Sequence, residues 1–199
     1  MFGRHPTASP ESIGVIVVMG IDPGVASTGF GVVRVAGSTM NALDAGVITS
    51  PPDQPPAARL ALIHEGLREL ISWHGPLALA LEDIYFGQNV GSAVGVGQAR
   101  GVAMLAAAQG GVPCFDYTPQ AVKKAVCGSG AAAKEQVQRM VGSLLGLPRP
   151  PESDHAADAL AVAICHAAAT RPDGRGQPWE LASSHARGAA GHPRAGVTA

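Results

Sequence analysis

The sequence predicts an α/β domain built on a five-stranded mixed sheet flanked by helices, and three observations carry this prediction. Short apolar runs at 15–21 and 77–81 are typical of strands buried on both faces, and an acid follows each run. The apolar spacing changes to a helical period at Ala57. Short connections among the apolar segments before residue 50 favour an antiparallel meander of three strands, to which we expect parallel strands to be added.

The first strand is expected from Val15 onward and to end at Asp22. Side chains alternate along a pleated strand, so Met19 and Ile21 should face one side of the sheet, and Gly20 and Asp22 the other. A carboxylate beside an apolar strand is costly unless a cation or a strong donor meets it. Asp-Pro-Gly is also good turn chemistry, so Asp22 could simply begin a hairpin turn.

The remaining elements follow from apolar periodicity and from Pro and Gly punctuation. Further strands are expected at 30–35, 41–49, 77–81 and 112–117. Helices are expected from Ala57 to a stop at Gly75-Pro76, at 91–109, from Pro119 to a break at 128–130, at 134–145, and from 153 to about 169. The helix at 91–109 is dense in Gly and Ala, which suits close packing either in the core or against a second copy of the chain.

Composition bounds the class of protein. The 199 residues are 46% hydrophobic and 15% charged, which suits one domain with a real core. We expect this domain at 15–170, between a loose leader at 1–14 and a disordered, mildly basic tail at 171–199. Three scattered cysteines favour reduced thiols. No apolar run reaches the ~18 residues of a membrane span, and no signal peptide is evident, so we expect a cytoplasmic protein.

Acidic residues gather where chemistry is expected. Asp22 and Glu82 end strands, at the sheet edge where parallel α/β folds place their sites. Asp158 continues an apolar helical stripe and should therefore face inward, while His155 lies one turn before it. Glu82 could instead face water, and His155 could be a surface histidine. Asp154 is well placed as the helix N-cap, with Ser153 as the other candidate.

Groups that could hold a nucleic acid lie nearby in the sequence. Tyr85 and Phe86 could stack on a base, or could fill the core. The net charge of −1 does not indicate a general affinity for nucleic acid. Between residues 112 and 149, however, five basic residues stand against two acids, a local excess that could hold phosphates or could be solvated helix faces.

Several motifs in order resemble one known family. The segments GIDPGVASTGFGVV, LEDIYFGQN, GQARGVA, AAAKEQVQRMV and DHAADALAVAICH are similar to those of the RuvC Holliday-junction resolvases, which have a ribonuclease H-like fold. The resemblance covers most of 15–169. It implies that Asp22, Glu82 and Asp158 are metal ligands, with His155 where many members have a fourth Asp. Imidazole can bind a divalent ion and favours Mn²⁺ over Mg²⁺.

The resemblance also implies an activity: paired symmetric nicks in a four-way DNA junction, in recombination and DNA repair, by hydrolysis with two Mg²⁺ or Mn²⁺ ions. Tyr85 lies where many members have a Phe that opens bases, and Lys134 is expected to assist catalysis. The expected DNA contacts are Tyr85, Phe86, Asn89, Arg100, Lys123, Lys124 and Lys134.

The implied partners are a second copy of the chain and the branch-migration proteins RuvA and RuvB. Dimerisation is expected through the helix at 91–109, and Ala103→Arg is the substitution that would test it.

A rival interpretation starts from the same first strand. The pattern Asp-x-Gly-x-x-x-Thr at 22–28 also resembles the phosphate loop of actin-like ATPases and sugar kinases. Those folds have two such domains, for which this chain is short, and they lack a His-x-x-Asp closing the site. A catalytically silent DNA-binding module is a third possibility, against which the three carboxylates argue.

Overall fold

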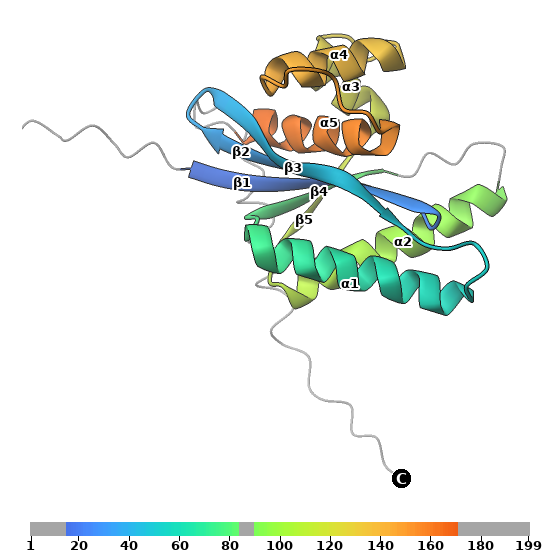
Figure 1. Cartoon of the computed structure of the whole chain (residues 1–199). Helices are drawn as coiled ribbons and strands as arrows, with labels where there is room; N and C mark the ends of the chain where they lie inside the picture. Colours follow the sequence, from blue (N-terminus) through green and yellow to red (C-terminus); the bar gives the residue numbers. More distant parts are fainter. Residues whose placement is uncertain (1–14, 84–89, 171–199) are drawn as a thin grey trace, which may run out of the picture.

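The fold is described by a computed structural model, which covers residues 15–83 and 90–170 (Figure 1). Five strands form one mixed sheet in the order β3-β2-β1-β4-β5. The strands are β1 (Val15–Asp22), β2 (Ser27–Ala36), β3 (Thr39–Thr49), β4 (Ala78–Glu82) and β5 (Cys114–Tyr117). The first three pair antiparallel, and β4 and β5 add in parallel, which confirms the predicted architecture.

Helices cover both faces of this sheet. They are α1 (Pro56–His74), α2 (Val90–Gln109), α3 (Pro119–Cys127), α4 (Lys134–Leu144) and α5 (Asp154–Ala169). Figure 1 shows α1 and α2 on one face and α3, α4 and α5 on the other. The predicted leader at 1–14 and tail at 171–199 lie outside the described residues, as do Tyr85, Phe86 and Asn89.

Strand alternation divides the core into two clusters, as the pleat of the first strand predicts. Met19 and Ile21 pack with α1 and α2, whereas Val18 packs with α5 on the other face. Leu79 and Ala80 repeat this division in β4. The two parallel strands therefore present matching faces, and this alignment determines which side their terminal acids occupy.

α5 lies directly on the backbone of β1 and β2. A methyl group added at Gly20 would overlap the carbonyl oxygen of Ala159, and one at Gly29 would overlap that of His155. At Gly31 it would lie 2.7 Å from the backbone nitrogen of Leu160. The helix side of the contact is also mostly small, since α5 is rich in alanine. These glycines bring the first turn of α5 close to the end of β1.

Several element boundaries differ from the sequence prediction. β2 begins at Ser27 rather than residue 30, because the long β3 pairs with it as far as Ser27. β4 and β5 begin later than predicted, at Ala78 and Cys114. Of the two N-cap candidates for α5, Ser153 is the cap and Asp154 is not: the Ser153 side chain accepts from the backbone of Ala156, and Asp154 is the first helical residue.

The helix at 91–109 is buried along one side only. Ala99, Ala103, Ala106 and Ala107 are fully or almost fully buried against the sheet and α1. Ala103 is therefore a core position, and the substitution suggested there would test folding rather than dimerisation. Within 15–83 and 90–170, no helix has the length and apolar character needed to cross a membrane.

Candidate active site

Two acids meet at the carboxyl ends of neighbouring strands. Ile21 pairs with Leu81 across the parallel β1–β4 ladder, so the next residues, Asp22 and Glu82, lie side by side. Both follow residues that face α1 and α2, and both therefore project toward α5. The alternation predicted for Asp22 is confirmed, and Glu82 shares its face.

The first turn of α5 brings a histidine and a third acid to the same place. Nδ1 of His155 lies 2.7 Å from Oδ2 of Asp22, close enough to donate a hydrogen bond to the carboxylate. Asp158, one turn later, is partly buried. Asp22 and Asp158 each raise the pKa of Glu82, which shows that the three carboxylates share one electrostatic environment. The site thus joins β1, β4 and α5.

The turn after Asp22 is held by the hydroxyl groups of Thr28, which ends the pattern at 22–28, and of Ser50, which the sequence prediction did not identify. The Thr28 hydroxyl donates to the carbonyl of Gly24 at 2.7 Å, and Thr28 is fully buried. The Ser50 hydroxyl donates to the carbonyl of Val25 and accepts from Arg59 at 2.9 Å. The turn formed by Thr28 agrees with the sequence, because hydroxyls next to Gly commonly close turns.

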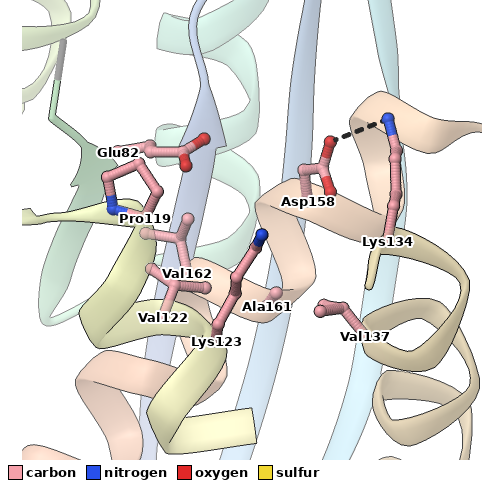
Figure 2. A pocket seen from close by; sticks show the side chains of 9 residues that line it. All are labelled: Glu82, Pro119, Val122, Lys123, Lys134, Val137, Asp158, Ala161 and Val162. Atoms are coloured by element: carbon pink, nitrogen blue, oxygen red, sulfur yellow. Dashed lines mark ion pairs between the residues drawn. The ribbon is translucent and has the colours of Figure 1, made fainter. Parts of the chain in front are cut away.

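A pocket of about 200 Å³ opens beside Glu82 and Asp158 (Figure 2). Its polar lining consists of Glu82, Lys123, Lys134 and Asp158. Its apolar lining consists of Pro119, Val122, Val137, Ala161 and Val162. Figure 2 shows the Lys123 ammonium pointing toward the space between the two carboxylates. Among the seven expected DNA contacts, Lys123 and Lys134 thus line the pocket, whereas Lys124 is exposed and is not part of its lining.

Burial and like charge act together on Glu82. Burial raises the pKa of its carboxyl most, Asp22 and Asp158 raise it further, and the result is about 7 despite the opposing effect of Lys123 and Lys134. Burial also raises the pKa of Asp158, against the lowering effect of Lys134. A group of carboxylates that resist ionisation in this way would be stabilised by a cation.

Lys134 binds two acids from the start of α5. Its ammonium lies 3.0 Å from Asp154 and 3.4 Å from Asp158. Asp154 also accepts a hydrogen bond of 2.7 Å from Gln138, one turn along α4. The hydrogen bond from Lys134 lowers the pKa of Asp154, and the same bond raises that of Lys134. Asp154, whose role the sequence left open, therefore ties α4 to the turn that carries His155 and Asp158.

Arg100 has protein partners. One guanidinium nitrogen donates to the backbone carbonyl of Glu82 at 3.0 Å, and another forms an ion pair with Asp116 of β5. Its side chain is only 13% exposed. The contact with DNA expected for Arg100 stays a prediction, and the structural contacts are a role that the sequence did not indicate.

The donor set fits hard divalent cations, since carboxylate oxygens are the ligands that Mg²⁺ prefers and imidazole adds a ligand suited to Mn²⁺. Within 15–83 and 90–170, no three His, Cys, Asp or Glu side chains already lie at metal-binding spacing. Two of the acids are engaged otherwise, Asp22 with His155 and Asp158 with Lys134. Side-chain rotation would thus accompany metal binding.

A mixed sheet in this order, with acids ending its two central strands and a third on the helix across them, defines a ribonuclease H-like nuclease. The family model described as "Crossover junction endodeoxyribonuclease RuvC" matches residues 18–166. The chain belongs to the RuvC family. This membership decides against the ATPase alternative and carries a general dependence on divalent metal ions.

Individual relatives agree with this assignment. The chain is 51% identical to crossover junction endodeoxyribonuclease RuvC of Pelotomaculum thermopropionicum over 152 residues, covering 76% of this chain and 93% of the relative. It is 50% identical to the enzyme of the same name from Chloroflexus aggregans over 149 residues, covering 75% and 91%.

Solved structures show the same fold. Thermus thermophilus RuvC is 40% identical, with a TM-score of 0.74 over 78% of this chain and 96% of that one. The T. thermophilus protein in complex with a Holliday junction substrate gives 41% identity and a TM-score of 0.76, over 78% and 95%.

Proposed function

We propose that this chain is an endonuclease that resolves four-way DNA junctions by metal-dependent hydrolysis of phosphodiester bonds. The observation that carries the proposal is the convergence of Asp22, Glu82 and Asp158, from three separate elements, beside a pocket lined by two lysines. The T. thermophilus relative solved with a Holliday junction supports the choice of substrate.

Each side chain has a proposed role. Asp22 lies between Glu82 and His155 and is the proposed bridging ligand, with Glu82 and Asp158 as flanking ligands. His155 either binds a metal ion or orients water. When bound, two divalent ions supply an activated water and stabilise the charge on the phosphoryl and leaving oxygens. Whether the ions are Mg²⁺ or Mn²⁺ is part of the test below.

The lysines have proposed roles toward the DNA backbone. Lys123 projects toward the space between Glu82 and Asp158, where it could meet a phosphate at the scissile position. Lys134 is held by Asp154, so it would keep a partner near the pocket when Asp158 turns to a metal ion. Lys124, on the exposed side of α3, is a proposed contact farther along the strand.

We also propose a homodimer in which each subunit cuts one strand, with RuvA and RuvB as partners in the cytoplasm. Val94, Met104 and Leu105 on the outer side of α2 are 58%, 44% and 51% exposed, which supports this helix as the contact between subunits. The three cysteines form no disulfide, in keeping with a reducing compartment.

The test compares a synthetic mobile four-way junction, a linear duplex and a fork, each with Mg²⁺ and with Mn²⁺. We expect paired nicks in the junction and little cleavage of the other two. Asp22→Asn should abolish cleavage and leave junction binding largely intact, because one proposed ligand is lost but the DNA contacts remain.

The matched control is Asp53→Asn, an exposed acid in the Pro-rich loop before α1. It should cut like the wild type. An Asp22→Asn variant that still nicks junctions would refute the metal assignment, and a wild type that cuts linear duplex equally well would refute the proposed substrate.

A further inference from the structure

Arg100 reaches the end of β4 from the side of the sheet opposite the pocket. It lies on α2, whose buried residues pack with Ile21 and Leu81. The pocket lies on the other face, where α3, α4 and α5 pack. Arg100 and the three carboxylates are therefore separated by the sheet, and the guanidinium meets the strand through its backbone.

The contacts of Arg100 fix the position where the chain leaves the sheet. Its hydrogen bond ends on the carbonyl of Glu82, the last residue of β4. Its ion pair ends on Asp116, which pairs with Leu81 in the parallel ladder. One planar guanidinium thus connects α2, the end of β4 and β5. The compact ammonium of Lys cannot reproduce this geometry, because it lacks the fork of donors that Arg has.

A backbone held at this point determines where the Glu82 carboxylate can go. Glu82 is the last residue of its strand, and the next residue, Asp83, donates a backbone hydrogen bond of 2.8 Å to Tyr117. Without the guanidinium, the Glu82 peptide would lose its hydrogen bond to α2. Residues that orient metal ligands from behind typically change metal affinity or activity by 10- to 100-fold.

We propose that Arg100 is a positioning residue, which holds the backbone of Glu82 so that its carboxylate binds the divalent ion together with Asp22 and Asp158. This inference rests on the proposed function, in which Glu82 is a metal ligand. It assigns Arg100 to the assembly of the site and not to the surface that holds DNA.

The experiment measures Mn²⁺ binding directly, by electron paramagnetic resonance, in the full chain without DNA. Arg100→Met should weaken Mn²⁺ binding about 10- to 100-fold. Arg100→Lys should weaken it less, because the lysine ammonium keeps the positive charge and can donate a hydrogen bond. Asp116→Asn removes only one partner of Arg100 and should weaken binding in the same direction. Junction cleavage should require correspondingly more Mn²⁺ and recover at saturating metal.

Junction binding separates positioning from DNA contact. Without divalent metal, Arg100→Met should bind the junction with the wild-type affinity and the same dependence on salt. Loss of a phosphate contact would instead reduce the salt slope by about one and weaken binding. Lys123→Met, at a proposed phosphate contact, is the control that should show that reduction.

Each outcome decides the proposal. Unchanged Mn²⁺ affinity in folded Arg100→Met, or a reduced salt slope, overturns it. Thermal melts identify a variant that fails to fold. If Arg100→Met does not fold, the Mn²⁺ affinity and salt slope of Arg100→Lys and Asp116→Asn decide the proposal. A wild type that binds Mn²⁺ but does not cut junctions contradicts the proposed function while the effect of Arg100 on Mn²⁺ binding can still be measured.

Discussion

Glu82 shows how a functional side chain can oppose folding. Its carboxyl is partly buried beside two other acids, and its pKa rises from 4.5 to about 7. In the unfolded chain the group ionises near 4.5, so between these values the folded state holds a proton that the unfolded state has lost. The free energy of unfolding therefore falls as pH rises from about 4.5 to 7, and the full cost remains above 7.

Replacing this carboxyl with an amide should stabilise the metal-free protein. At pH 8 we expect Glu82→Gln to unfold at a higher denaturant concentration than the wild type. Its free energy of unfolding should be larger by at most about 3 kcal/mol, on the basis of 1.36 kcal/mol per pKa unit. The gain should disappear near pH 4.5. Denaturant melts at the two pH values measure it.

The control is Glu65→Gln on the exposed side of α1, which should change stability little at either pH. A Glu82→Gln variant that is less stable than the wild type at pH 8 would contradict the cost assigned to the buried charge.

At the residue scale, the sequence predicted where the acids lie better than it predicted the contacts of the residues around them. Asp22, Glu82 and Asp158 could be found because an acid on a buried strand or on an apolar helix face is costly unless a cation or donor meets it. Arg100 was expected only as a DNA contact, and its contacts within the fold could not be predicted, because its partners are a backbone carbonyl and an acid on another strand. Ser153 and Asp154 were both plausible caps, and only three-dimensional contacts with Lys134 and Gln138 separate them.

At the scale of elements, small residues set the distance between α5 and the sheet. Any side chain at Gly20 would have to displace the backbone of α5, which carries His155 and Asp158. The Gly and Ala content of the helix at 91–109 indicated close packing there, and Ala99 and Ala103 are indeed buried, but the sequence did not indicate the close contact between β1 and α5. The contact between β1 and α5 joins residues far apart in the chain and leaves no local pattern.

Gly20→Ala should therefore be strongly destabilising. Because the new methyl group would meet backbone atoms that cannot move independently, we expect a loss of about 3 kcal/mol, at the upper end of the range for overpacked cores. Thermal or denaturant unfolding measures it.

Gly142→Ala in α4 is the matched control, since its methyl group would meet Pro150 at an ordinary 3.6 Å. It should gain about 0.5 kcal/mol from helix propensity. Equal stability of the two variants would show that α5 can move away from the sheet.

Strand boundaries show the limit of local patterns. Polar Ser27 and Thr28 extend β2 because β3 is long enough to pair with them. Leu77, although apolar, stays 61% exposed and outside β4. Tertiary pairing decides these ends, whereas the antiparallel meander of the first three strands could be predicted from the short connections between them.

At the scale of the whole molecule, the outer side of α2 is the proposed contact between subunits. Leu105→Arg should convert the dimer to a monomer near 20.1 kDa, because it places a charge among exposed apolar side chains that the partner would cover. Light scattering after size exclusion measures the mass at micromolar concentration.

Leu43→Arg, at a similarly exposed leucine on the edge strand β3, should leave the mass unchanged. If Leu105→Arg and the wild type have the same mass, α2 is not the contact. Ala103 is unsuitable for this test because it is buried.

α5 is the last described element in the chain, and it supplies both His155 and Asp158. While the polypeptide is being synthesised, Asp22 and Glu82 leave the ribosome before His155 and Asp158. Until α5 follows, one face of the sheet lacks the helix that covers it. Until α5 has been made, a growing chain therefore carries only part of the proposed metal site.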